Sequence, residues 1–282
     1  MRVELPKFSE LLRRETHDRN AALATRPMMS DGSVSVLMVG NSLLLAGIDR
    51  VRLAQTMGPQ FHAVLYPIEN TDYLDWQFGL RRLFAEGARP SAVVLVMDQF
   101  QMLSDQTKGE EFAYSLMQIG DLPAVVRASH LDTMTTSAYF FSHFSALLGQ
   151  RAHLRNGLLS RWLPNANELA LHLTARNAPP MNASQSAVQE VIGRLKEMQR
   201  LCLEYRADFI YLVPPSLNPA NPAKTVRSTA AQDDVKVLVP FLPLELPEVD
   251  FSDRYHLTSD GAELFTDRVA RTLTAVLRTP GN

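Results

Sequence analysis

Residues 33–42 read Ser-Val-Ser-Val-Leu-Met-Val-Gly-Asn-Ser, and this stretch decides the fold. The run 33–39 is short, apolar and rich in β-branched side chains, with almost no polar alternation. Such a run is typical of a strand that is buried on both faces, as in a parallel sheet. Gly40 then permits a sharp turn, so that Ser42 can present its hydroxyl just beyond the carboxyl end of the strand.

Four further runs have the same character, the last of them weaker, at residues 62–66, 92–97, 209–213 and 235–239. Helical patterns separate these runs. Asp49 is expected to cap a helix that ends at Gly58, and Thr71 is expected to cap the next helix. Strands that alternate with helices predict an α/β fold, here a three-layer, flavodoxin-like parallel sheet of about five strands.

The two clearest helical patterns cover residues 185–205 and 259–277. Each places its apolar side chains on one stripe and its charged side chains largely off it. Cys202 lies in the first stripe, so a buried structural thiol is expected. Because it is the only cysteine, an internal disulfide framework and an all-cysteine metal site are excluded.

Three segments depart from the strand–helix alternation. Residues 98–182 read as several short helices and predict a helical insertion after the third strand, beside the sheet edge where Ser42 lies. Residues 214–234 contain four prolines and many small polar residues, and predict a long loop. Residues 1–30 are polar and predict an N-terminal extension, so the whole chain, 1–282, is expected to be one domain.

An aromatic cluster inside the insertion has two interpretations. Tyr139, Phe140, Phe141 and Phe144 are close together in the sequence and could form the wall of an acyl or lipid pocket. Aromatic residues at this spacing more often belong to an ordinary hydrophobic core, which is the favoured interpretation.

Composition excludes several classes of function. The chain has 28 basic and 30 acidic residues, a formal net charge of −2, and no dense basic run, so no nucleic-acid partner is expected. The N-terminus lacks the apolar segment of a signal peptide, and no stretch of 18 apolar residues occurs. A cytoplasmic protein is therefore expected, or a periplasmic one if a natural leader has been removed.

No motif for a cofactor or a metal is found. The remaining histidines, apart from His256, show no metal-ligand spacing, so no metal site is predicted. Neither a GxxxxGK nor a GxGxxG segment occurs, so no nucleotide cofactor is predicted.

Two short segments at opposite ends of the chain carry chemistry. Ser42 follows the first strand, where ligands of an open parallel sheet gather. A serine hydroxyl needs a base to become a nucleophile, and His256, just before the last helix, can supply it. Asp253, three residues earlier, can orient the imidazole and stabilise its charged form. The alternatives are a helix-capping serine and a turn that merely satisfies its own hydrogen bonds.

Gly40-Asn41-Ser42 after the first strand, with Asp253-x-x-His256 before the last helix, resembles the SGNH/GDSL hydrolase superfamily. Residues 40–49, GNSLLLAGID, are similar to the opening of its cell-envelope branch, which includes O-acetyltransferase relatives. The segment from Asp253 through Gly261 to Phe265 resembles the family's closing segment. The resemblance covers both ends of the chain and says little about residues 98–182.

The family usually supplies a second-block glycine and a third-block asparagine to its oxyanion hole, and this sequence departs from both. The loop 66–71 has no glycine, and the loop 97–101 has no asparagine. The side-chain amides of Asn70 and Gln99 are the candidate replacements, with a backbone N–H near Ser42 as a further donor. The alternatives are a turn asparagine and an ordinary loop amide. Asp98 is a candidate for orienting other groups of the site.

The resemblance implies serine-dependent acyl-ester chemistry, as an esterase or an O-acyltransferase, on an acylated small molecule, glycan or cell-envelope substrate. A transferase of this kind implies a membrane protein that donates acyl groups as a further partner. The alternative function is a catalytically weak or inactive domain of the same fold that binds a glycan or a protein. The atypical oxyanion residues motivate that alternative.

Overall fold

The computed structural model describes residues 10–151 and 184–278. Within these ranges, five parallel strands form one sheet in the order β2-β1-β3-β4-β5. The strands are β1 (Val34–Gly40), β2 (Phe61–Pro67), β3 (Ala92–Val96), β4 (Asp208–Leu212) and β5 (Lys236–Leu238). This is the strand order of flavodoxin-like folds, so the predicted architecture is confirmed, with each strand within two residues of its expected bounds.

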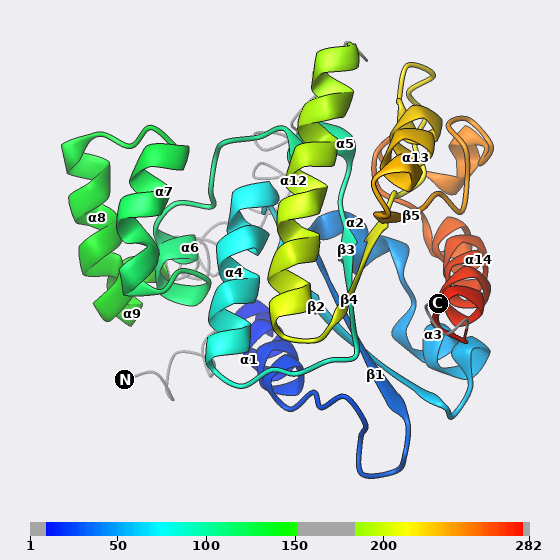
Figure 1. Ribbon diagram of the computed structural model, residues 1–282, viewed down its shortest axis with the longest axis horizontal. Coiled ribbons are helices and arrows are strands. Elements are labelled where there is room, and N and C mark those ends of the chain that lie inside the picture. The colour runs from blue at the N-terminus through cyan, green and yellow to red at the C-terminus, as the bar shows by residue number, and fades with distance from the viewer. Residues whose placement is uncertain (1–9, 152–183, 279–282) are drawn as a thin grey trace, which may run out of the picture.

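Helices cover both faces of the sheet (Figure 1). The first face carries α1 (Glu10–Leu23), α4 (Tyr73–Ala85), α12 (Gln185–Glu204) and α13 (Ala223–Gln232). The second face carries α2 (Ser42–Gly47), α3 (Arg50–Met57) and α14 (Ser259–Arg278). Side chains alternate along each strand, so Leu37 and Val39 enter the first core while Val36 and Met38 enter the second.

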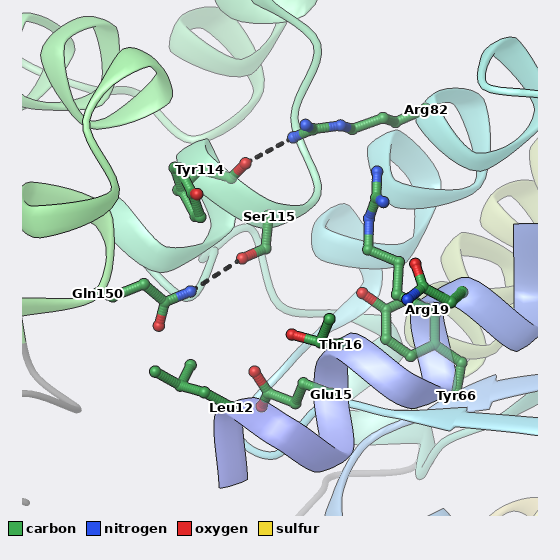
Figure 2. Close-up of a pocket in the computed structure, with 10 residues that line it drawn as sticks. Leu12, Glu15, Thr16, Arg19, Tyr66, Arg82, Tyr114, Ser115 and Gln150 are labelled. Carbon is green, nitrogen blue, oxygen red and sulfur yellow. Dashed lines mark hydrogen bonds between the residues drawn. The ribbon is translucent and has the colours of Figure 1, made fainter. Parts of the chain in front are cut away.

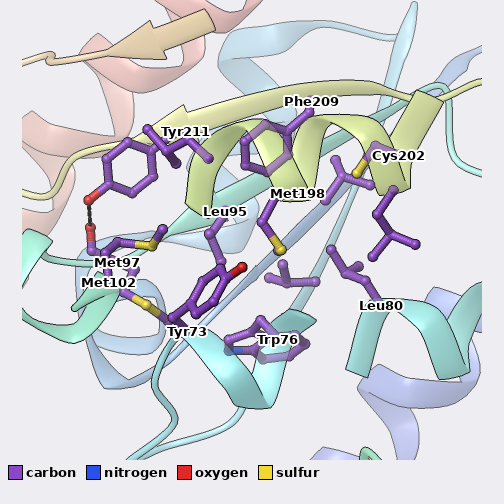
Figure 3. Packing of buried hydrophobic residues seen from close by; sticks show 14 of the residues in the cluster. Tyr73, Trp76, Leu80, Leu95, Met97, Met102, Met198, Cys202, Phe209 and Tyr211 are labelled. Atoms are coloured by element: carbon purple, nitrogen blue, oxygen red, sulfur yellow. Dashed lines mark hydrogen bonds between the residues drawn. The ribbon is translucent and has the colours of Figure 1, made fainter. Parts of the chain in front are cut away.

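Figure 3 shows the first core, where Met198 and Cys202 of α12 lie over strands β3 and β4. Cys202 is fully buried, and burial raises the pKa of its thiol. A buried, protonated thiol is a poor nucleophile. Cys202 is therefore a packing residue, as the helical stripe indicates.

The strand order places a topological switch point between β1 and β3. From β1 the chain crosses to β2 on one side of the sheet, and β3 then lies on the other side of β1. Ligands in open α/β sheets bind where the order reverses in this way, beyond the carboxyl ends of the strands. Gly40 ends β1 there, paired with Pro67 on β2 and Val96 on β3.

The described part of the insertion begins with α5 (Gln99–Met102), which follows β3 and lies near α12. The other helices form a small group beside α4 (Figure 1): α6 (Glu110–Ser115), η2 (Ile119–Asp121), α7 (Leu122–Ala128), α8 (Thr133–Phe144) and α9 (Ala146–Gly149). The rings of Phe78 on α4 and Phe112 on α6 meet at 6.2 Å, and Arg82 donates to the carbonyl of Tyr114 at 2.6 Å. Residues 152–182 of the predicted insertion lie outside the described residues.

The sequence missed two helices, and the expectation of a loop throughout residues 214–234 was wrong. The predicted N-terminal extension contains α1, whose buried side includes Glu15 and Asp18, so its sequence shows no clean apolar stripe. Arg50 forms a bidentate pair with Asp18 at 2.7 and 2.6 Å, which compensates the buried carboxylate. The predicted loop 214–234 contains α13, because Val226 and Ala230 give it a narrow buried stripe.

The cap of α4 also differs from the expectation. The N-cap residue is Asp72, which forms a capping box with Asp75. Thr71 instead donates its hydroxyl to the carbonyl of Ile68 at 2.7 Å and accepts from the indole N–H of Trp76 at 2.9 Å. Thr71 therefore fixes the loop before the helix rather than the helix terminus.

Replacing Gly40 by Ala is expected to destabilise the protein by about 3 kcal/mol or more, because the added methyl group would overlap the backbone carbonyl of Val96. The matched control is Gly193→Ala, an exposed position within α12 where no atom lies near the added group. That change should stabilise the helix by about 0.5–1 kcal/mol. Urea unfolding of the two variants measures both effects, and equal stabilities would contradict the close approach of β1 and β3.

Candidate active site

Ser42 is the first residue of α2, directly beyond the carboxyl end of β1. The preceding residue, Asn41, is fully buried and caps this helix, with its Oδ1 accepting from the N–H of Leu43 at 3.0 Å. The Nδ2 of Asn41 donates to the carbonyl of Thr71 at 3.1 Å. Asn41 thus joins the turn that carries Ser42 to the loop after β2.

The second part of the site is the loop that precedes α14. An antiparallel bridge between Phe251 and Leu257 closes this loop, and Thr258 caps α14 by accepting from the N–H of Gly261 at 3.3 Å. Asp253 Oδ1 accepts from the backbone N–H of His256 at 2.7 Å and from that of Tyr255 at 3.1 Å. The Asp253 carboxylate therefore closes the turn that carries His256, and Thr258 fixes the start of α14 behind it.

These two segments bring together Ser42, His256 and Asp253. His256 Nε2 lies 2.9 Å from Ser42 Oγ, and His256 Nδ1 lies 2.7 Å from Asp253 Oδ2. The His256 side chain is 29% exposed and that of Asp253 is 55% exposed. The hydrogen-bonded chain therefore opens to solvent while its serine end adjoins the sheet.

The environment keeps Asp253 ionised. Partial burial is the largest single influence and opposes ionisation, but the hydrogen bonds from the His256 N–H, the His256 ring and the Tyr255 N–H outweigh it and lower the pKa of Asp253. One carboxylate oxygen holds the loop backbone, and the other faces the imidazole. Asp253 can thereby fix a tautomer in which Nδ1 carries the proton and Nε2 accepts from Ser42.

Asp98 lies at the carboxyl end of β3 and is buried. Its Oδ1 caps α5 by accepting from the N–H of Phe100 at 3.1 Å, and its Oδ2 accepts from the Nδ2 of Asn221 at 3.3 Å. Burial raises the pKa of Asp98 to about 6. Asp98 therefore joins the end of β3 to the loop after β4, and no hydrogen bond links it to Ser42 or His256 in the described residues.

Gln99 is the residue after Asp98 and is fully buried. Within the described residues, neither the nitrogen nor the oxygen of its amide has a hydrogen-bond partner. A buried amide without partners destabilises a fold by about 1–3 kcal/mol for each unmet group. This is the kind of departure from good packing that functional sites retain.

Asn70 lies in the loop after β2 and is exposed, with a left-handed backbone (φ 57°) that asparagine tolerates better than most residues. The N–H of Ile68 donates to the carbonyl of Gly40 at 2.9 Å, and Asn41 holds the carbonyl of Thr71. These two bonds fix the loop of Asn70 against the turn that carries Ser42.

Three residues of this region had no role in the sequence-based prediction. Tyr255 stacks edge-on against His256 at 5.1 Å and lies 6.1 Å from the ring of Phe100, so it connects α5 to the histidine loop. Asn221 pairs with Asp98, and Asn41 links two loops. Only Asn41 had a signal in the sequence, since it stands between Gly40 and Ser42.

A separate polar pocket of about 160 Å³ lies on the first face of the sheet, between α1, α4, α6 and the end of α9 (Figure 2). Tyr66, Arg82 and Gln150 are among its lining residues. Burial raises the pKa of Tyr66, and the Arg82 guanidinium is occupied by backbone carbonyls and Glu86. The residues predicted for the active site do not line it.

The described residues contain no cluster of three or more histidine, cysteine or acidic side chains arranged to hold a metal ion. They also contain no helix with the length and apolar character needed to cross a bilayer.

No protein-family model and no curated protein matches this chain. Among solved structures, it is similar to a protein from Bacteroides fragilis described as an acylhydrolase, with 10% identity, a TM-score of 0.47, and coverage of 92% of this chain and 94% of that chain. It is also similar to the lipase Lip_vut3 from a goat rumen metagenome, with 9% identity, a TM-score of 0.40, and coverage of 85% and 97%. The activity of the chain is therefore inferred from its own residues.

Replacing Asp98 by Asn is expected to change how stability depends on pH. The unfolded carboxyl ionises near its ordinary pKa of 3.8, and the folded one near 6. The folded state therefore keeps its proton to a higher pH than the unfolded state does. As the pH rises from 3.8 to about 6, the free energy of unfolding of the wild type decreases. Relative to Asp98→Asn, the wild type should lose about 2 kcal/mol as the pH rises from about 4 to about 7. Urea unfolding at both pH values measures this, and a pH-independent difference would contradict the raised pKa.

Proposed function

We propose that this chain is a serine-dependent acyl-ester hydrolase or O-acyltransferase in which Ser42, His256 and Asp253 form the catalytic triad. One observation carries the proposal: an unbroken hydrogen-bonded chain from Ser42 Oγ through the imidazole to Asp253. It joins residues 214 positions apart in the sequence, at the switch point of the sheet. A serine that merely caps a helix would not need this partner.

In the proposed reaction, Ser42 Oγ attacks the carbonyl carbon of an ester while His256 Nε2 takes the hydroxyl proton. The tetrahedral intermediate collapses, the C–O bond to the leaving alcohol breaks, and the imidazolium returns the proton to that alcohol. Water, or the hydroxyl of an acceptor, then attacks the acyl-serine while His256 takes its proton. The bond from the acyl carbon to Ser42 Oγ breaks, the acid or the new ester leaves, and the imidazolium returns the proton to Oγ. The Asp253 carboxylate stabilises the imidazolium in both steps.

The oxyanion of the intermediate needs donors, and the cap of α2 restricts where they can come from. The N–H of Leu43 donates to Asn41 Oδ1, and the N–H groups of Leu44 and Leu45 donate to the carbonyl of Asn41. These three N–H groups are occupied, which leaves the N–H of Ser42 itself as the backbone candidate, with side-chain amides as the other donors. Asn70 has the exposed amide and the tethered loop for this role, and Gln99 has an amide without partners on the adjoining strand end.

The proposed substrate class rests on the two motifs near the ends of the chain, Gly40-Asn41-Ser42 and Asp253-x-x-His256. Their resemblance to the cell-envelope branch of the SGNH/GDSL hydrolases supports an acylated glycan or another cell-envelope ester as the substrate. An exposed histidine edge supports a bulky substrate, because the site is not enclosed. The alternative, a weak or inactive domain that binds a glycan, predicts an intact hydrogen-bonded triad that fails to form an acyl-serine.

Ser42→Ala and His256→Ala should each remove nearly all turnover of p-nitrophenyl acetate, and the double variant should be little worse than either one. Residues that act as a unit are strongly non-additive. A fluorophosphonate probe should add one phosphonyl group to the wild type and none to Ser42→Ala, measured by intact mass.

The control for this experiment is Ser228→Ala, which removes an exposed serine hydroxyl on α13. It should keep both turnover and labelling. A wild type that neither turns over esters nor reacts with the probe would favour the binding function, and a labelled, active Ser42→Ala would exclude the triad.

Asn70→Gly should lower kcat by roughly 10–10³-fold with a smaller change in KM, since a transition-state donor is lost. Glycine keeps the left-handed backbone without strain, so the loop is preserved. The matched control is Asp234→Gly, another exposed position with positive φ, which should leave kcat unchanged. Steady-state kinetics of the three proteins decide the matter, and an unchanged kcat in Asn70→Gly rules out this donor.

A further inference from the structure

The described residues expose one concentrated apolar surface, on α8 and α9. Six of the fourteen large hydrophobic side chains that are exposed in the described residues lie within residues 134–148. We name them the α8–α9 apolar surface: Met134, Phe140, Phe141, Phe144, Leu147 and Leu148. Scattered exposed hydrophobics are normal, but a cluster of this kind marks a binding surface.

The aromatic members are contiguous. The Phe140 ring lies 5.6 Å from that of Phe141 and 5.3 Å from that of Phe144, both in edge-to-face geometry. Phe141 and Phe144 are 59% and 65% exposed. The favoured sequence-based interpretation, that these rings belong to the core, was wrong, because only Tyr139 of the cluster is buried.

The orientation of α8 is fixed by its other side. The Tyr139 hydroxyl shares a hydrogen bond of 2.7 Å with Thr107, and its ring lies 6.2 Å from that of Phe112 on α6. His143 Nδ1 lies 3.0 Å from the carbonyl of Ala113. These polar contacts hold α8 on α6 with its phenylalanines outward, and Figure 1 shows α8 at the outer edge of the molecule.

The segment that bears the surface carries no formal charge, because residues 133–150 contain no aspartate, glutamate, lysine or arginine. Charged side chains of neighbouring segments occur at its Met134 end, where Glu110 and Arg151 pair with each other. The phenylalanine and leucine side chains themselves therefore offer no charge to an acidic or basic partner. Aromatic and leucine side chains on one side of a helix, with small uncharged polar residues around them, suit the boundary between lipid headgroups and acyl chains.

The size of the surface argues against a second copy of the chain as its occupant. A large exposed side chain presents about 150–250 Å², which gives the six residues, at their exposed fractions, roughly 600 Å². A stable dimer requires about 800 Å² from each partner. Binding to a lipid surface requires no such minimum buried area, because each apolar side chain can insert into the lipid separately.

We infer that the α8–α9 apolar surface docks the protein on an uncharged lipid surface, with Phe141 and Phe144 inserted at the headgroup level. This inference is independent of the triad. The absence of charge implies that binding persists at high salt and does not require anionic lipid.

The test uses the full chain in flotation with phosphatidylcholine vesicles. The wild type should float with the vesicles, and Phe141→Ser/Phe144→Ser should lower the partition coefficient at least tenfold. Leu147→Ser/Leu148→Ser provides a second, independent reduction on α9. The matched control is Val51→Ser/Val249→Ser, which removes two equally exposed side chains elsewhere and should bind as the wild type does.

Three results would overturn the inference. One is a wild type that stays with the unbound fraction. Another is flotation that needs phosphatidylglycerol or disappears in salt, which would indicate an electrostatic surface. The third is a wild-type dimer in light scattering that Phe141→Ser/Phe144→Ser converts to a monomer, which would make a second copy the occupant. Circular dichroism confirms that each variant is folded, and ester turnover is measured separately.

Discussion

The close contact between the ends of β1 and β3 is the constraint on which the candidate site depends. Gly40 lies so near the carbonyl of Val96 that only glycine fits between the strands. Asn41 can then turn inward, cap α2 and hold the loop after β2 through Thr71. These contacts leave Ser42 at the switch point, facing a histidine that arrives from the other end of the chain. A wider spacing between the strands would move all three loops apart.

The sheet could be predicted from the sequence, and the three residues of the proposed triad could be singled out, because each has a local signature. The five strands are apolar runs, since burial on both faces removes polar alternation. The turn from Asp253 to His256 has a local cause too, because one carboxylate oxygen accepts both backbone N–H groups of the turn. No local pattern indicates that Asp253 and His256 lie next to Ser42. That proximity depends on the order of the strands in the sheet, and an alternation of strands and helices is compatible with more than one order.

The features that sequence patterns missed depend on tertiary partners. Helix α1 buries Glu15 and Asp18, so its buried side shows no continuous apolar stripe in the sequence. Asp18 is held there by its ion pair with Arg50. α13 follows prolines and small residues that are typical of loops, and it needs only Val226 and Ala230 against the core. The surroundings of Asp98 and Gln99 could not be read from the sequence either. Asp98 pairs with Asn221, 123 positions away, and the Gln99 amide has no hydrogen-bond partner in the described residues.

The solvent exposure of the proposed triad and of the aromatic rings together affects how this chain would meet a substrate. Helix α6 packs the insertion against α4, and within the described residues the His256 side chain stays 29% exposed. An imidazole edge that is open to water favours hydrolysis over transfer unless an acceptor or a surface displaces that water. An uncharged surface on the same insertion could bring the molecule to where acylated amphiphiles concentrate. For the proposed activity, selectivity would then depend on where the protein binds as much as on the shape of its site.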